Sequence, residues 1–267
     1  MELKSQISEA LNTKWAAKEI YCYNEIDSTN EEAKRLVGEG AEHGALVVAE
    51  SQTHGKGRRG RVWESPKGES IYMTILLKPS IAPTEASMLT LVMALAVAES
   101  LKEMYGTKPE EFQIKWPNDI VCHKKKVTGI LTEMSADMEK IHYVIIGVGI
   151  NLNLTQIPEA LRETATSLFL ETRKKQERSQ VIAKIMECFE QKYEKFVCSH
   201  NLKFLKEDYE KLLVNMNAQV RVLDPKGNYE GIAKGINEEG ELLIEKDGSI
   251  IPVYAGEVSV RGIYGYV

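Results

Sequence analysis

The residues best suited to chemistry in this chain are cations and glycines gathered in one short segment. Between Gln52 and Arg61 there is no acidic residue, and the segment contains four cations and three glycines: Lys56, Arg58, Arg59, Arg61, Gly55, Gly57 and Gly60. Glycine allows backbone N–H groups to turn toward a ligand, and the guanidinium fork of arginine matches the oxygens of a phosphate group. The segment therefore predicts a loop that binds a polyanion.

This basic segment does not match the common nucleotide-binding loops. It lacks the Gly-Lys-Ser/Thr ending of a Walker loop, and it does not fit the dinucleotide-binding pattern. A solvated surface loop is the alternative, because runs of charge usually face solvent. Hydrophobic strand patterns at residues 45–49 and 71–77 frame the segment and Trp63 closes it, which favours a loop that binds a ligand.

A second group of polar residues, Ser28, Thr29 and Asn30, leads into a helical pattern. Ser28 or Thr29 suits an N-cap position, and Glu31 or Glu32 would complete a capping box. Small hydroxyl and amide side chains can also satisfy the donors and acceptors of a bound ligand. Both roles stay open, since one residue can cap the helix while its neighbour binds a ligand.

Two glycines in one predicted strand, Gly147 and Gly149, lie on the same face of that strand. Their spacing predicts that a ligand or another backbone approaches the strand closely there. Hydrophobic spacing and turn residues predict the remaining elements of this part of the chain. They are helices at residues 2–18, 83–101, 179–197 and 201–214, and strands at residues 19–23, 112–115, 120–121, 127–134 and 143–153.

The composition shifts at about residue 215. Short alternating segments separated by turns follow one another from there to the C-terminus, and this pattern predicts a small antiparallel barrel. A length of 267 residues suits one large domain and one small domain. We therefore expect domains at residues 1–214 and 215–267.

The overall composition limits the classes of function. A net charge of −5 argues against a protein that binds nucleic acid with its whole surface. The four cysteines contain no C-x-x-C pair and the five histidines are dispersed, so a structural zinc site is not expected. Cys22 and Cys122 lie in apolar strand patterns and are predicted to be buried thiols.

No targeting or membrane segment is predicted. The N-terminus lacks the cationic and apolar regions of a signal peptide. The longest apolar stretch, Met88–Ala98, is predicted to be too short to span a bilayer. The roughly eighteen residues before the first predicted strand are too few for a winged-helix DNA-binding domain. We expect a cytoplasmic protein that binds neither DNA nor a membrane.

Three motifs together resemble the biotin protein ligases. The string GKGRRGR at residues 55–61 is similar to the family signature GRGRRGR, and KWPND at residues 115–119 and GVGIN at residues 147–151 resemble family strings. Lys56 stands where the family usually has arginine, so a planar fork becomes a point charge. The resemblance covers about residues 20–267 and implies an α+β fold, with a mixed, largely antiparallel sheet, helices as in class II synthetases, and an SH3-like C-terminal barrel.

The resemblance also implies a two-step reaction. The carboxylate of biotin attacks the α-phosphorus of ATP to give biotinyl-5′-AMP and pyrophosphate, and a lysine of a biotin carboxyl carrier protein then attacks this anhydride and releases AMP. Mg²⁺ is expected with ATP, although no dedicated acidic pair is recognised, and a homodimer is possible. A lipoyl or octanoyl ligase of the same superfamily is the near alternative, and a nucleic-acid-binding regulator is the distant one.

The resemblance assigns catalysis to Lys126, which aligns with the catalytic lysine of the family. Arg58 is a second candidate, because two anions that react need cations at the point of attack. Asp119 is the candidate for binding a metal or the acceptor lysine, with a turn-forming residue as the alternative. Lys124 and Lys125 are expected to be solvated hairpin residues. The implied biotin-binding residues are Ser28, Thr29, Asn30, Gln52, Lys56, Gly57, Arg58 and Lys126. The implied ATP- and adenylate-binding residues are Gly55, Arg58, Arg61, Trp63, Asn118, Lys126 and Asn151.

Overall fold

A seven-stranded sheet forms the centre of the larger part of the protein. The computed structural model describes residues 2–106, 111–256, 258–263 and 265–267. The strand order of the sheet is β1-β2-β3-β7-β6-β5-β4, and all pairs are antiparallel except β1 with β2. The expected mixed, largely antiparallel sheet is therefore confirmed. Its strands are β1 (Ile20–Tyr23), β2 (Leu46–Ala49), β3 (Ile71–Leu77), β4 (Phe112–Lys115), β5 (Asp119–Cys122), β6 (Lys125–Ala136) and β7 (Ile141–Ile150).

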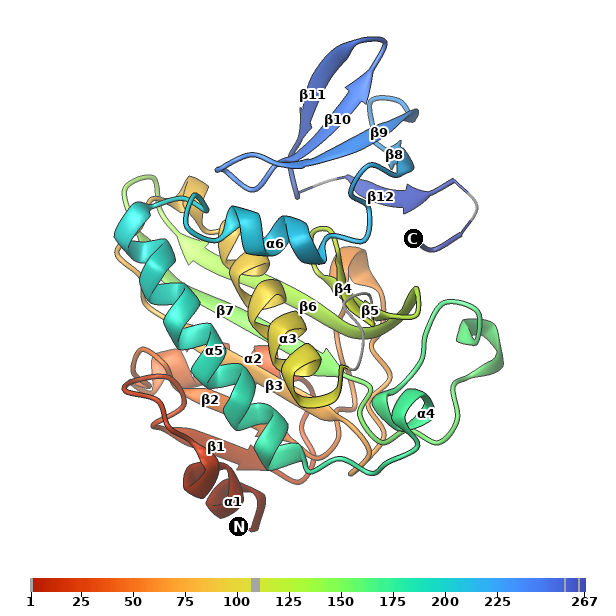
Figure 1. The fold of residues 1–267 in the computed structure, drawn as a ribbon. Helices are drawn as coiled ribbons and strands as arrows, with labels where there is room; N and C mark the ends of the chain where they lie inside the picture. Colours follow the sequence, from red (N-terminus) through yellow and green to blue (C-terminus); the bar gives the residue numbers. More distant parts are fainter. Residues whose placement is uncertain (1, 107–110, 257, 264) are drawn as a thin grey trace.

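Two long helices, α3 (Met88–Tyr105) and α5 (Arg178–Ser199), cover one face of this sheet (Figure 1). Side chains in a strand point alternately to the two faces, so each strand contributes to a core on both sides. Leu46 and Val48 belong to the core under α3 and α5, whereas Val47 belongs to a smaller core under α2 (Thr29–Gly38). The sheet thus has a helix-covered face and a second face that α2 covers only in part.

The second face carries the two glycines of β7. Val144 and Ile146 lie in the core under α3 and α5, and Ile145 lies in the core under α2. Gly147 and Gly149 follow Ile145 at intervals of two residues, so they lie on the same face as α2. This face holds the candidate site described below.

Helix α3 is the most apolar helix of the molecule. Within the described residues, the segment Pro83–Tyr105, which is longer than the apolar stretch Met88–Ala98, is long and apolar enough to cross a membrane by length and composition alone. However, 72% of its most apolar window is buried inside the protein. Leu89, Leu95 and Leu101 are fully or almost fully buried, which identifies α3 as a core helix.

The first helix ends earlier than its hydrophobic spacing predicts. Helix α1 is Glu2–Ala10 rather than residues 2–18. The cause is Glu190 of α5, whose carboxylate accepts hydrogen bonds from the backbone N–H groups of Lys14 and Ala16 at 2.7 and 2.8 Å. A long-range contact therefore replaces the helical hydrogen bonds there. The other helices are α4 (Leu168–Thr172) and α6 (Lys206–Leu212), and single 3₁₀ turns occur at Arg58–Gly60, Pro83–Glu85 and Glu159–Leu161.

The C-terminal part contains a separate five-stranded sheet, in which all pairs are antiparallel and the order is β11-β10-β9-β8-β12. It stands over the end of the molecule where α6, β4 and β5 lie (Figure 1). The Trp116 indole N–H donates to the backbone oxygen of Gly240 at 3.0 Å and ties the two sheets together. The strands are β8 (Gln219–Leu223), β9 (Tyr229–Ile236), β10 (Leu242–Lys246), β11 (Ser249–Val253) and β12 (Ser259–Gly262), of which sequence patterns did not predict β12.

Candidate functional site

Two cavities on the second face of the large sheet meet at a shared wall. The first cavity extends toward the start of α2, where Ser28, Thr29 and Asn30 line it together with Gln52. The second cavity has a volume of about 470 Å³ and extends toward the C-terminal sheet. The residues common to both are called the junction here. The junction consists of Gly57, Arg58, Trp63, Asn118 and Lys126.

Glycines form the floor under the junction. Neighbouring side chains lie so close to their Cα atoms that a Cβ atom would not fit. A Cβ atom at Gly149 would lie 2.5 Å from the indole of Trp63, and one at Gly129 would lie 2.8 Å from the same ring. A Cβ atom at Gly147 would lie 2.1 Å from Oδ1 of Asn30. Contacts this short do not occur with a real Cβ atom, so Gly147 and Gly149 are closely approached, but by side chains and not by the ligand or backbone that was predicted.

The first cavity presents an ordered set of donors and acceptors. Oδ1 of Asn30 accepts from the Thr74 hydroxyl at 2.7 Å, and its Nδ2 donates to Glu133 at 2.8 Å. The backbone N–H and the hydroxyl of Thr29 both donate to Oε1 of Gln52, at 2.9 and 3.2 Å. These fixed polar groups suit a small ligand that has both hydrogen-bond donors and acceptors.

Ser28 occupies the N-cap position of α2, but its side chain makes no capping hydrogen bond. Glu31 and Glu32 do not form the expected capping box either, because they bind cations instead. Glu32 accepts from Arg35 at 2.6 Å, and Glu31 accepts from Lys34 at 2.8 Å. The capping prediction was therefore wrong for the side chains, and the 2% exposed Ser28 lines the first cavity.

The basic loop adopts a closed hairpin over the junction. The N–H of Gly57 donates to the carbonyl of Arg61 at 2.7 Å, and the N–H of Trp63 donates to the carbonyl of Gly55 at 2.9 Å. Arg59 has a left-handed backbone with φ of 58°, a region in which non-glycine residues are uncommon. Loop backbone groups therefore bond to each other, and the loop offers its side chains to the cavities.

Arg58 is the loop cation that reaches the junction. Its guanidinium donates to Oδ1 of Asn118 at 2.7 Å and to the carbonyl of Ala255 at 2.7 Å. Burial lowers the pKa of Arg58, while the charge of Asp119 acts in the opposite direction. Arg58 thus links the loop, the turn after β4 and the C-terminal sheet region.

Lys126 and Asp119 form an ion pair beside the junction, with 2.7 Å between the ammonium and Oδ1. Burial opposes ionisation of Asp119, but the charges of Lys126 and Lys115 outweigh it and hold the pKa of Asp119 below its usual value. Burial lowers the pKa of Lys115 to about 8. The Tyr266 hydroxyl donates to the other carboxylate oxygen of Asp119.

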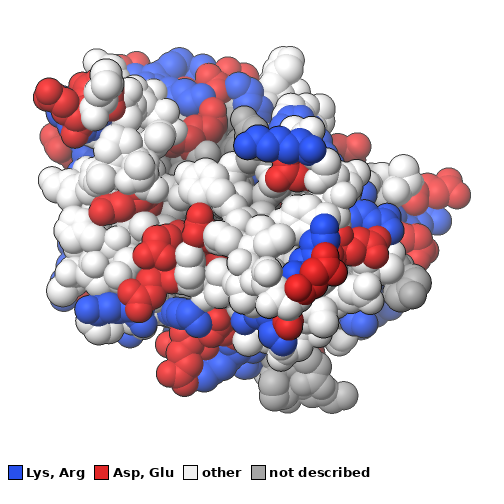
Figure 2. Space-filling model, turned by 90° about the horizontal axis from the view of Figure 1, so that it is seen from above, with Lys and Arg blue, Asp and Glu red and all other residues white. Residues whose placement is uncertain are grey.

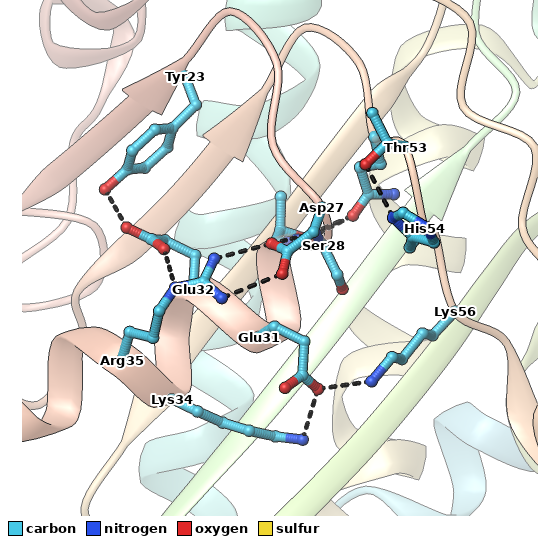
Figure 3. A network of polar contacts seen from close by, with 12 residues as sticks. Tyr23, Asp27, Ser28, Glu31, Glu32, Lys34, Arg35, Thr53, His54 and Lys56 are labelled. Atoms are coloured by element: carbon cyan, nitrogen blue, oxygen red, sulfur yellow. Dashed lines mark hydrogen bonds and ion pairs between the residues drawn. The ribbon is translucent and has the colours of Figure 1, made fainter.

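Lys56 lines the first cavity, yet its charge points away from the junction. Its ammonium lies 2.8 Å from Oε1 of Glu31 on α2, and Figure 3 shows this oxygen shared with Lys34. The loop lysine that replaces the family's usual arginine is therefore paired with α2. This geometry gives its ammonium no contact with the junction.

Trp63 lies across the glycine floor with Lys126 above it, where the ammonium is 5.2 Å from the ring centroid. The indole Nε1 is buried and has no hydrogen-bond partner among the described residues. Arg61 and Asn151 line the second cavity, and Nδ2 of Asn151 donates to the carbonyl of Thr166 at 3.0 Å. Gly55 borders neither cavity, so its place in the loop is structural.

Sequence patterns did not assign Lys115, Tyr266 or the Ala255 carbonyl to the site. Lys115 belongs to the KWPND string and could have been included on that basis. Tyr266 and Ala255 carry no local signal, because their contacts depend on where the C-terminal part lies.

A further group of residues outside the two cavities was also missed. Potential metal-ligand atoms of Cys122, His123 and Glu171 lie within 4.8 Å of one another, and His123 is 2.7 Å from Glu171.

Comparisons with known proteins show which family this chain resembles. Residues 23–151 match the Biotin/lipoate A/B protein ligase family, and residues 216–261 match the Biotin protein ligase C terminal domain. The chain is 35% identical over 259 residues to the "Bifunctional ligase/repressor BirA" of Bacillus subtilis, an alignment that covers 96% of this chain and 78% of that protein. It is 31% identical to the "Biotin--[acetyl-CoA-carboxylase] ligase" of Mycobacterium tuberculosis over 86% of this chain and 85% of that protein.

A solved structure gives the same result in three dimensions. The biotin protein ligase from Aquifex aeolicus in complex with biotin and ATP superposes with a TM-score of 0.79 and 33% sequence identity. The superposition covers 92% of this chain and 99% of that chain. The similarity therefore extends through both sheets.

Proposed function

Because the chain belongs to the biotin protein ligase family, we propose that it uses ATP to attach biotin to a lysine of a biotin carboxyl carrier protein through biotinyl-5′-AMP. The observation that carries this proposal is the junction between the two cavities. It brings together Arg58, Asn118 and Lys126 at the one place from which both cavities can be reached. A reaction between two separately bound substrates needs such a meeting point.

We assign biotin to the first cavity and the nucleotide to the second, on the chemistry of their lining residues. The ureido ring of biotin has one carbonyl acceptor and two N–H donors, which match the hydroxyl and amide groups of Ser28, Thr29 and Gln52. The second cavity has the cations Arg61 and Lys115 in its lining, which suit phosphate oxygens. In this arrangement the biotin carboxylate and the α-phosphate meet at the junction.

The junction cations promote adenylation. The biotin carboxylate and the α-phosphate are both anions, so bringing them together costs free energy unless positive charge lies between them. Arg58 and Lys126 supply that charge in a fixed, partly buried arrangement, which stabilises the transition state more than mobile solvent does. The pairing of Lys126 with Asp119 at 2.7 Å holds the ammonium in place before the substrates bind.

Trp63 and the closed loop exclude water from the mixed anhydride. Exclusion matters because biotinyl-5′-AMP is prone to hydrolysis. The Trp63 ring already lies on the glycine floor, and the loop hairpin contributes Gly57 and Arg58 to the lining of the junction. An acceptor lysine must therefore enter through the second cavity, which extends toward the C-terminal sheet.

Mg²⁺ is proposed to accompany ATP by binding its phosphate oxygens, as this ion commonly does. Asp119 does not fit as its ligand in this structure. One carboxylate oxygen of Asp119 is engaged by Lys126 and the other by Tyr266. No step of the mechanism is assigned to a metal bound by the protein.

We place the domain boundary between residues 214 and 215, which is supported by the separate five-stranded sheet that starts at Gln219. A homodimer could form through an edge strand of the large sheet, β1 or β4. We also propose a cytoplasmic location. The face of the molecule seen in Figure 2 has interspersed acidic and basic side chains.

The product assay tests the proposal directly. The protein is incubated with ATP, Mg²⁺ and a purified biotin carboxyl carrier domain, and the mass of the carrier is measured after addition of biotin, lipoate or octanoate. We expect the carrier to gain one biotinyl group and no lipoyl or octanoyl group. Modification by lipoate or octanoate to the same extent would show that the substrate assignment is wrong.

A further inference from the structure

Tyr266, the penultimate residue, lies against the catalytic ion pair although it is 147 positions away from Asp119 in the chain. Its hydroxyl donates to Oδ2 of Asp119. The ammonium of Lys115 lies 3.8 Å from the centroid of its ring. Tyr266 also lines the second cavity beside Arg261. The C-terminal segment therefore contributes a polar group and an aromatic face to the site.

The two oxygens of Asp119 have different partners. Oδ1 lies 2.7 Å from the ammonium of Lys126 and accepts from Nδ2 of Asn118 at 3.1 Å. Oδ2 accepts from Tyr266. A carboxylate with a partner on each oxygen cannot rotate about its Cβ–Cγ bond without breaking one of these contacts. Tyr266 thus fixes the plane of the carboxylate that holds Lys126.

Asp119 needs these partners because it is only 8% exposed. A buried carboxylate is unfavourable as an anion unless charges and hydrogen bonds compensate for lost hydration. Lys126 and Lys115 supply charge, and Tyr266 supplies a hydrogen bond to the ionised form. Burial and the Asp119 charge raise the pKa of Tyr266, so its hydroxyl keeps the proton that it donates.

We propose that Tyr266 is a positioning residue for adenylation: its hydroxyl keeps Asp119 ionised and oriented, and Asp119 in turn holds the ammonium of Lys126 at the junction. This inference rests on the proposed ligase function. It gives the C-terminal segment a part in the first chemical step. If the C-terminal segment only docked the five-stranded sheet, removal of the Tyr266 hydroxyl would not change the ionisation of Asp119.

Other charged groups around Asp119 belong to separate elements and remain in place when Tyr266 changes. They are Lys115 on β4, Lys126 on β6 and Arg58 in the basic loop. These groups are cationic and favour the ionised carboxylate. Arg61 in the basic loop and Arg261 on β12 act on Lys115 and Tyr266. Removal of the tyrosine hydroxyl alone therefore isolates the contribution of one hydrogen bond.

The test is the pH dependence of biotin-driven pyrophosphate exchange in Tyr266→Phe. A group with a depressed pKa is active above that pKa and loses activity as the pH falls through it. Loss of the hydroxyl removes a donor to the ionised form, so the pKa of Asp119 rises and the acid limb moves to higher pH. We expect a movement of about one pH unit, the size of a hydrogen bond to a charged group.

Tyr254→Phe is the matched control, because it removes the same hydroxyl from an exposed tyrosine of the C-terminal part. Its acid limb should coincide with that of the parent protein. The activity at each pH is divided by the folded fraction measured by circular dichroism at that pH, because a destabilised variant that unfolds in acid would move the limb in the same direction. An unshifted limb in Tyr266→Phe would overturn the inference, whereas a parent protein with no biotin-driven exchange would instead overturn the proposed function.

Discussion

Lys126 is the residue on which the proposed chemistry depends most. It lines both cavities, pairs with Asp119 at 2.7 Å and lies 5.2 Å from the ring centroid of Trp63. The neighbouring Lys124 is in the turn between β5 and β6, with a left-handed φ of 67°. Two lysines of the same hairpin thus have different surroundings, and only one of them borders the junction.

Replacement of Lys126 by alanine should reduce the rate of biotinyl-5′-AMP formation by at least about tenfold, because a fixed charge at the reacting atoms is lost. Lys124→Ala in the same hairpin should change the rate by less than about twofold, as expected for a surface substitution. Both rates are measured by single-turnover adenylation. Equal losses in the two variants would show that the hairpin as a whole, and not the Lys126 ammonium, supports the reaction.

Gly147 tests the assignment of the first cavity to biotin. A Cβ atom in Gly147→Ala would lie 2.1 Å from Asn30, so Asn30 must move out of its hydrogen bonds. Overpacking of this kind costs about 1–3 kcal/mol, and we expect the KM for biotin to rise by about tenfold while the KM for ATP changes little. Gly38→Ala, with no atom within 4 Å of the added Cβ, should leave both constants unchanged. A rise in the KM for ATP alone would reverse the cavity assignment.

At the scale of elements, three sets of contacts hold the basic loop in place. Its own hairpin bonds close it, Arg58 connects it to Asn118 and Ala255, and Lys56 connects it to Glu31 on α2 (Figure 3). The Lys56 side chain in this ion pair is about half exposed. Exposed ion pairs contribute little to the free energy of folding, typically about 0.2–1 kcal/mol. We therefore expect Lys56 to affect how often the loop opens and not its closed shape.

Glu31→Gln should make the loop open more often, because it weakens the contact of Lys56 with α2. Trypsin cleavage within residues 56–61 should be about two- to fivefold faster than in the parent protein, the factor that corresponds to a weak exposed ion pair. Glu32→Gln changes a neighbouring acid that binds Arg35 and Tyr23, and its cleavage rate should match the parent. If the two variants are cleaved equally fast, Lys56 does not restrain the loop.

Sequence patterns predicted the elements well where the signal is local. The apolar run identified β3 at residues 71–77 with its observed bounds, and the helix predicted at residues 83–101 is observed as α3 at Met88–Tyr105. The patterns failed where a distant group decides the structure. Glu190 ends α1 early through the backbone of residues 14–16, and Ser28 does not cap α2 although its position is correct.

In the candidate site too, sequence patterns succeeded where the signal is local and failed where a distant group decides the structure. The family strings placed Arg58, Asn118 and Lys126 in the site, and the structure brings them together at the junction. Lys56 was assigned by similarity to an arginine, but a glutamate on α2 pairs with its ammonium. Tyr266 could not be found, because a single tyrosine near a chain end has no spacing that points to Asp119.

At the scale of the whole molecule, the two sheets cooperate in one site. The large sheet supplies the glycine floor, Lys126 and Asp119, and the C-terminal part supplies Tyr266 and the Ala255 carbonyl that binds Arg58. Trp116 adds a buried hydrogen bond to Gly240 at 3.0 Å between the two parts. The position of the C-terminal sheet therefore bears on catalysis as well as on stability.

Isotope exchange between pyrophosphate and ATP tests the central claim most directly, because it reports formation of the acyl-adenylate without any carrier protein. The account predicts rapid exchange with biotin present, no exchange without it, and no exchange when lipoate or octanoate replaces biotin. Exchange without biotin, or exchange driven equally by lipoate or octanoate, would contradict the conclusion that biotin and ATP react at the junction of Arg58, Asn118 and Lys126.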